Sequence, residues 1–128
     1  MRVLALDHGA ARCGAAVSDP TGTLATPLEP VLTPDTRKGL TRVVTLVEEL
    51  GAERVVVGLP LALHGGDSAQ TRAARAFAER LQARLKVPVD LYDERFTTRI
   101  AARAGGKAAE DSRAAAVLLE DWLATQVR

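Results

Sequence analysis

The hydrophobic periodicity of the chain changes close to residue 33, and this change limits the folds available to it. Three short extended runs precede the change, at residues 3–6, 13–18 and 23–32. The turns between them, Asp7-His8-Gly9 and Asp19-Pro20-Thr21-Gly22, are rich in residues that bend the backbone, because Pro fixes φ and Gly supplies positive φ. Three consecutive strands with short turns predict an antiparallel meander. Two prolines within residues 23–32 predict that this run is an edge strand or an interrupted strand.

After residue 33 the apolar residues recur with the period of a helix. They fall at i, i+3, i+4, i+7 and i+10 on one face: Leu40, Val43, Val44, Val47 and Leu50. Thr33 is the expected N-cap of this helix and Pro34 its first residue. Gly51 suits the position just beyond its C-terminal end.

Strands and helices alternate in the rest of the chain. Strands are expected at 54–58 and 87–92, with a helix between them that begins at a capping box of Asp67 and Gln70. A helical stretch ends at Gly105-Gly106, and a final helix starts at about residue 111. The inner face of that helix consists of four apolar residues: Ala115, Leu118, Leu119 and Trp122. This alternation implies right-handed crossovers and parallel strands.

Composition narrows the functional classes. The 128 residues fit a single domain, 1–128, and the 47% hydrophobic and 26% charged residues are typical of a globular protein. Aromatic residues make up only 3%, which argues against an RNA binder that stacks bases on side chains. The single Cys13 excludes an internal disulfide and a multi-cysteine metal site, and we expect it to be buried and inert. No apolar run is long enough to cross a membrane, so a cytoplasmic location is expected.

Three acidic residues stand at the expected ends of strands and helices. Asp7 ends the first strand, Glu94 follows the strand at 87–92, and Asp111 begins the last helix. Each also has a purely structural interpretation: a turn-forming Asp, an exposed turn, and an N-cap. Strand alternation puts Asp93 and Glu94 on opposite faces, so only one of them can point toward Asp7.

Acidic side chains from these three segments would meet at one edge of the sheet. Carboxylate oxygens are hard ligands that suit Mg²⁺ or Mn²⁺. Two such ions ~3.5–4 Å apart can clamp the attacking and leaving oxygens of a phosphodiester. His8 and His64 are isolated in the sequence, and we expect them to be loop residues rather than metal ligands.

Four blocks of sequence stand out: Leu6-Asp7-His8-Gly9 with residues 12–19, Val57-Gly58-Leu59-Pro60 with Gly65-Gly66, Asp93-Glu94-Arg95-Phe96-Thr97-Thr98, and residues 111–116. Together they resemble the YqgF/RuvX family, which belongs to the RNase H-like superfamily. The resemblance implies an α/β fold with a mixed five-stranded sheet, an antiparallel meander followed by parallel strands, and helices on both faces. It carries Asp7, Glu94 and Asp111 over as the catalytic and metal-binding residues of a two-metal site.

The family is described as nucleases that process the 5′ end of pre-16S rRNA and as Holliday junction resolvases. The resemblance therefore implies a hydrolase that acts on precursor rRNA or branched DNA, with ribosomal assembly intermediates as further partners. A monomer or weak homodimer is expected. The chain departs from the family at Ala10-Ala11, where a Thr-Lys pair is usual, and in a shorter segment between Thr98 and Asp111.

Basic residues next to the acidic blocks are candidates for substrate binding. Four recur every four residues, as on one side of a helix: Arg95, Arg99, Arg103 and Lys107. With Arg12 and Arg113, they are expected to hold the phosphate backbone. A solvated helix face is the other interpretation of this stripe.

Two other functions remain open at this point. Actin- and hexokinase-type ATPases also open with Asp-x-Gly on a three-stranded meander, but no second Asp-x-Gly follows a strand in this sequence. An RNase H-like scaffold could instead bind RNA or an assembly partner without cutting, because all three acids have structural interpretations. Calorimetry with ATP separates the first of these from a nuclease, and metal-dependent cleavage separates the second.

Overall fold

The computed structural model describes residues 1–61, 64–94 and 107–126, and for residues 107–111 the backbone alone. Within them the elements are, in chain order, β1 (Val3–Asp7), β2 (Arg12–Ser18), β3 (Ala25–Leu32), α1 (Arg37–Leu50), β4 (Arg54–Leu59), α2 (Ala69–Arg84), β5 (Val89–Asp93) and α4 (Lys107–Gln126).

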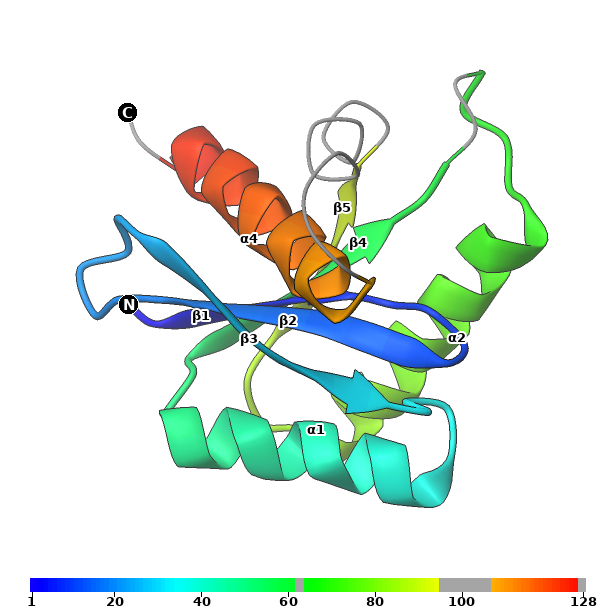
Figure 1. Cartoon of the computed structure of the whole chain (residues 1–128), viewed down its shortest axis with the longest axis horizontal. Coiled ribbons are helices and arrows are strands. Elements are labelled where there is room, and N and C mark those ends of the chain that lie inside the picture. Colours follow the sequence, from blue (N-terminus) through cyan, green and yellow to red (C-terminus); the bar gives the residue numbers. More distant parts are fainter. Residues whose placement is uncertain (62–63, 95–106, 127–128) are drawn as a thin grey trace.

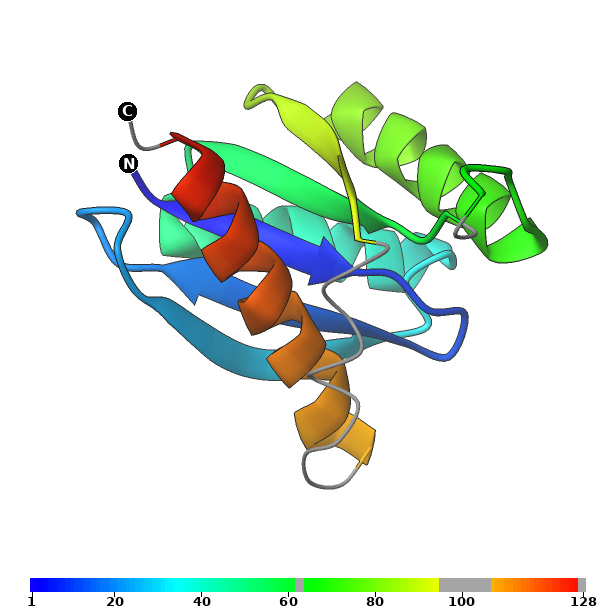
Figure 2. The same ribbon diagram turned by 90° about the horizontal axis from the view of Figure 1, so that it is seen from above.

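The five strands form one sheet in the order β3-β2-β1-β4-β5 (Figures 1 and 2). β1 pairs antiparallel with β2, and β2 pairs antiparallel with β3. β4 runs parallel to β1, and β5 runs parallel to β4. The expected mixed sheet is therefore confirmed. β3 lies at one edge, as its two prolines predict.

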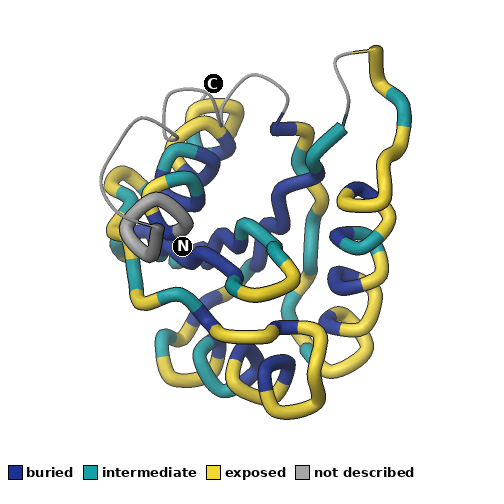
Figure 3. Tube along the Cα trace, turned by 45° about the vertical axis from the view of Figure 1, so that its right-hand side comes forward, coloured by how far each residue is buried: buried dark blue, intermediate teal, exposed yellow. Residues whose placement is uncertain are grey.

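Helices cover both faces of the sheet (Figure 1). α1 and α2 pack on one face over a core that includes Leu4, Leu6 and Phe77. α4 packs on the other face against Val3 and Ala5. Figure 3 shows the buried residues concentrated on the strands and on the helix sides turned toward them. The alternation along β1 thus decides which layer each of its side chains contacts.

Two sequence predictions about buried residues are confirmed. Cys13 is fully buried in the core between the sheet and α1 and α2. The predicted inner face of the last helix, Ala115, Leu118, Leu119 and Trp122, is buried against the sheet. No helix among the described residues combines the length and apolar character needed to cross a membrane.

The start of α1 was predicted three residues too early. Thr36 is the N-cap, and its side chain accepts a hydrogen bond from the Gly39 N–H. Thr33 lies before the helix with a φ of 42°, and its N–H donates to the Ala11 carbonyl. Thr33 thus extends the sheet hydrogen bonding by one residue, which prevents it from capping a helix. Gly51 ends α1 in the left-handed conformation with a φ of 63°, as predicted.

The capping box of α2 was predicted one residue too early. Ser68 and Thr71 form it, each side chain accepting from the backbone N–H of the other. Asp67 instead pairs with Arg75, at 3.2 Å. Thr71 is fully buried and also donates to the Pro60 carbonyl, at 2.6 Å. This contact joins α2 to the end of β4 and decides which residue caps the helix.

The start of α4 also differs from the prediction. The helix begins at Lys107, so Asp111 lies inside it and is not its N-cap. Residues 107–110 (Lys-Ala-Ala-Glu) all have good helix propensity, which is why the helix extends toward the N-terminus past the predicted start.

Candidate active site

Asp7, Gly58 and Glu94 lie at the C-terminal ends of three neighbouring parallel strands, with Glu94 two residues beyond Tyr92, the partner of Gly58 in β5. Asp7 ends β1, Gly58 is in β4, and Glu94 follows β5 directly. Each stands two residues after a side chain that packs toward α4; these side chains are Ala5, Val56 and Tyr92. Because side chains alternate along a strand, all three positions face the α4 side of the sheet.

Gly58 provides the space in which the Glu94 carboxyl group lies. A methyl group at position 58 would overlap Oε2 and Cδ of Glu94 and would come within 3.1 Å of Leu118 Cδ2 in α4. The carboxyl group therefore lies over β4, between the strand and α4. Glu94 is 5% exposed although it immediately follows an edge strand.

The electrostatics of Glu94 confirm that it is close to Asp7. The pKa of Glu94 is raised to about 8, chiefly by burial and then by the negative charge of Asp7 and a hydrogen bond with it. The charge of Asp93 adds a smaller effect. Asp93 itself is exposed, so the two adjacent acids do face opposite ways, and Glu94 is the one near Asp7.

The N-terminal half of α4 lies level with the end of β1. Ser112 Oγ donates a hydrogen bond to the carbonyl of Leu28 in β3. Leu28 pairs with Ala15 in β2, and Ala15 pairs with Leu6, the neighbour of Asp7. Asp111 immediately precedes Ser112. Its side chain lies outside the described residues, so its convergence with Asp7 and Glu94 remains a prediction.

The donor set of this site fits a divalent cation of the magnesium type. The Glu94 carboxyl group occupies a buried space that a side chain at position 58 would fill, and the half-buried Asp7 lies within hydrogen-bonding contact of it. Oxygen donors of this kind select Mg²⁺ or Mn²⁺ over Zn²⁺. Among the side chains that the structure describes, no group of three His, Cys, Asp or Glu residues could hold a metal ion. A third protein ligand would therefore have to come from outside that set.

Both histidines lie in loops, as predicted. His8 Nε2 is 2.9 Å from Asp35 Oδ1, and its ring packs on Phe77. His64 is exposed and accepts a hydrogen bond from the Gly66 N–H.

The structure describes two of the predicted substrate-binding side chains. Arg12 is half-buried at the start of β2. Gly14 pairs with Asp7, and Arg12 stands two residues before Gly14. Because side chains alternate along a strand, Arg12 lies on the same face of the sheet as Asp7. Arg113 is exposed on α4. The remaining residues of the proposed basic stripe lie outside the described side chains: Arg95, Arg99, Arg103 and Lys107.

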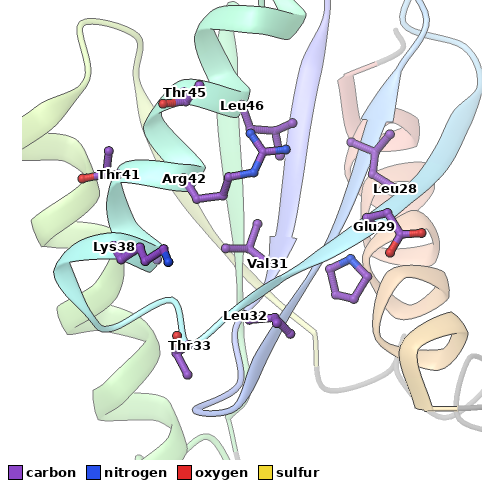
Figure 4. Close-up of a pocket in the computed structure, with 12 residues that line it drawn as sticks. Leu28, Glu29, Val31, Leu32, Thr33, Lys38, Thr41, Arg42, Thr45 and Leu46 are labelled. Carbon is purple, nitrogen blue, oxygen red and sulfur yellow. The ribbon is translucent and has the colours of Figure 1, made fainter.

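A cavity of about 790 Å³ lies elsewhere, between the edge strand β3 and α1 (Figure 4). Its lining includes Leu28 and Leu32 from β3 and Lys38, Arg42 and Leu46 from α1. It is on the α1 side of the sheet and contains no pair of acidic residues, so it is separate from the carboxylate site.

The family model described as RuvX, Holliday junction resolvase, matches residues 1–125. The chain belongs to the RuvX family. A relative from Thermobifida fusca is 43% identical over 145 residues, covering 98% of this chain and 88% of the relative. One from Chloroflexus aurantiacus is 37% identical over 130 residues, covering 94% and 85%. Both are named "Putative pre-16S rRNA nuclease".

A third relative with the same name, from Koribacter versatilis, is 44% identical over 97 residues, and the match spans 63% of its length. Among solved structures, Thermus thermophilus RuvC superposes with a TM-score of 0.63 at 18% identity and covers 98% of this chain and 96% of its own. That likeness confirms the RNase H-like fold. At the level of its family, the chain is a hydrolase of phosphodiester bonds.

Sequence reasoning missed two contributors to the site. The first is Gly58, although a glycine inside an apolar strand is a known sign of close approach by another group. The second is the contact between His8, the neighbour of Asp7, and Asp35, which are far apart in sequence and show no pattern that would link them.

Proposed function

We propose that this member of the RuvX family is a metal-dependent endonuclease that cuts precursor 16S rRNA near its 5′ end. The observation that supports it most is the contact between two carboxyl groups, those of Asp7 and of Glu94, which lies over Gly58. The names of the relatives supply the substrate class.

In this proposal Asp7 and Glu94 hold Mg²⁺ or Mn²⁺ together with Asp111. A pair of such ions would activate water and stabilise the negative charge that develops on the phosphate. Glu94 must lose its proton before it can ligate a cation, because its pKa is raised to about 8. Cation binding therefore releases a proton at neutral pH and should strengthen as the pH rises.

The spacing of residues along α4 supports Asp111 as the third ligand. It stands four residues before Ala115 and seven before Leu118, about one and two turns of helix. Both of those residues are buried against the sheet, and Leu118 borders Gly58. This spacing is the support for including Asp111 with Asp7 and Glu94.

Substrate binding is assigned to the basic residues around these acids: Arg12, Arg95, Arg99, Arg103 and Arg113. Arg12 shares the sheet face of Asp7, which supports its contact with a phosphate next to the scissile bond.

The test uses a 5′-extended 16S precursor RNA with Mg²⁺, Mn²⁺ or a chelator. Cleavage is expected with either ion and none with the chelator. Asp7→Asn, Glu94→Gln and Asp111→Asn should each lose at least about a hundredfold in rate while remaining folded. Glu49→Gln is the matched control, because Glu49 is an exposed carboxylate that pairs with Arg42 on α1. Full activity in Asp7→Asn would overturn the proposal.

A four-way DNA junction is the second substrate, because the family description names a Holliday junction resolvase. Cleavage of the junction but not the RNA would assign the same carboxylates to branched DNA. Metal-independent RNA binding without cleavage of either substrate would indicate an assembly module. Calorimetric binding of ATP would point instead to the actin-like ATPase alternative.

A further inference from the structure

His8 follows Asp7 directly but faces the opposite side of the sheet. Its ring packs on Phe77 of α2, with centroids 4.8 Å apart and planes tilted by 34°. Phe77 is fully buried in the core on the α1 and α2 side. Asp7 faces the α4 side, so adjacent residues contact different layers of the molecule.

The His8 side chain is also held by a hydrogen bond. Nε2 lies 2.9 Å from Oδ1 of Asp35, in the turn before α1, and the carboxylate can only accept, so the ring N–H donates. The His8 side chain is 4% exposed, compared with 43% for Asp35. A polar ring this deeply buried needs the partner it has, because an unsatisfied buried donor is destabilising.

The turn before α1 holds the loop after β1 at a second point. The Thr33 N–H donates to the Ala11 carbonyl at 2.9 Å. Close packing keeps both turns compact, since a methyl group on Gly39 would overlap the Thr33 carbonyl and one on Gly9 would meet the Arg12 carbonyl at 2.6 Å. The β1–β2 connection is therefore held at His8 by Phe77 of α2 and Asp35, and at Ala11 by Thr33 of the turn before α1.

We infer that His8 is a positioning residue that holds Asp7 beside Glu94. This inference rests on the proposed function of the carboxylate pair. Asp7 and Glu94 repel each other once Glu94 has lost the proton it must give up to bind a cation, and the last residue of a strand is the part of it most easily displaced. The contacts of His8 with Asp35 and Phe77 oppose that displacement from the far side of the sheet, so the ligands are already in place when a cation arrives.

The test compares four variants with the wild-type protein. His8→Phe keeps an aromatic ring against Phe77 and removes the hydrogen bond. Asp35→Ala removes the acceptor, whereas Asp35→Asn retains an acceptor oxygen and should rescue. Glu49→Gln again serves as the control, since it neutralises a carboxylate on α1 that does not touch the loop.

The first measurement is amide hydrogen exchange in the metal-free protein. Exchange over residues 5–9 should be about tenfold faster in His8→Phe and Asp35→Ala, with β4 unchanged and with near wild-type values in Asp35→Asn and Glu49→Gln. Unchanged exchange at residues 5–9 in both impaired variants would overturn the inference. This readout needs neither metal nor substrate, so it decides the role of His8 even if the nuclease proposal fails.

The second measurement is Mn²⁺ affinity by calorimetry, followed by steady-state cleavage of the precursor RNA. Residues that orient a ligand typically change metal affinity by about 10–100-fold. Weaker Mn²⁺ binding by about tenfold and a lower kcat, with an unchanged KM for RNA, are expected in His8→Phe and Asp35→Ala. Wild-type Mn²⁺ affinity and kcat in a destabilised His8→Phe would show that His8 only packs. A wild-type protein without Mn²⁺ binding or cleavage would refute the proposed function instead.

Discussion

Position 58 is where the site has the least room for a side chain, and a glycine stands there. Gly58→Ala adds one methyl group where Glu94 Oε2 lies, with Leu118 preventing escape toward α4. We expect the Glu94 carboxyl group to move by about 1 Å and the cleavage rate to fall by about a hundredfold. Steady-state kinetics on precursor RNA measure this loss.

Gly51→Ala is the control for Gly58→Ala, because it also adds a methyl group to a glycine but lies away from the site. Gly51 has a φ of 63° and open space around it, so a methyl group there strains the backbone without touching the site. It should lower the free energy of unfolding by about 1 kcal/mol and leave the rate unchanged. A fully active Gly58→Ala would mean that Glu94 does not need the position it has.

The β2–β3 turn is an element stabilised by one carboxylate. Asp19 accepts the backbone N–H groups of Thr23 and Leu24, both at 2.7 Å, and the hydroxyl of Thr21. The Thr21 hydrogen bond, followed by those backbone donors, holds the pKa of Asp19 well below its usual value. A lowered folded-state pKa stabilises the protein above the unfolded-state pKa, and this contribution is lost as the pH falls.

Asp19→Ala should therefore lower Tm at pH 7 by a few degrees, with the difference shrinking as the pH falls below about 4. Thermal unfolding followed by circular dichroism at several pH values measures it. Glu29→Ala, an exposed acid on the adjacent β3, should show no such pH-dependent difference. A constant difference at all pH values would show that the carboxylate charge plays no part.

The proposed basic stripe is a second element with a measurable signature. Each phosphate contact contributes about −0.9 to the log–log salt slope of binding on duplex DNA and about −0.7 on single strands. Replacing Arg99 and Arg103 together should weaken binding to every sequence and flatten the slope by roughly one to two units. Arg72 and Arg80, exposed on α2 across the sheet, form the control pair. An unchanged salt slope in the variant lacking Arg99 and Arg103 would mean that these residues face solvent and do not contact phosphates.

The free energy of unfolding of the whole molecule should depend on the protonation of Glu94. Its pKa is raised from 4.5 to about 8, so between these values the folded state binds the proton more tightly than the unfolded state. Stability consequently falls as the pH rises through this window. Without metal, Glu94→Gln should remove that decline, so Tm at pH 8 rises by several degrees above wild type.

Calorimetric unfolding in a chelator from pH 5 to pH 9 tests this expectation. Added Mg²⁺ should raise the Tm of the wild-type protein and have little effect on Glu94→Gln, because binding to the folded state alone stabilises it. If the Tm of the wild-type protein and that of Glu94→Gln change with pH in parallel, Glu94 is not the cause of the decline in stability.

Much of the architecture follows from local pattern. Alternation identifies the buried strands and shows that only one of Asp93 and Glu94 can face Asp7, and the prolines of β3 mark an edge. Helix starts were wrong where a distant contact decides them, as with Thr33 on Ala11 and Thr71 on Pro60.

The site was predictable only as far as its acidic residues. The proximity of Asp7 to Glu94 depends on the order β1-β4-β5, in which residues of three separate segments become neighbours. The space at Gly58 and the hydrogen bond of His8 to Asp35 exist only in the folded chain. A glycine inside an apolar strand can hint at the first, but no pattern in a single sequence indicates the second.

The order β1-β4-β5 also bears on when activity can arise during synthesis. A growing chain makes β1 first, while β5 and Glu94 come about ninety residues later, and the strand between them must already be in place. A nascent chain that stops short of residue 94 has Asp7 but no partner carboxylate. The nuclease proposed here would therefore be inactive until most of it has been translated, and truncated products from interrupted translation could not cut RNA.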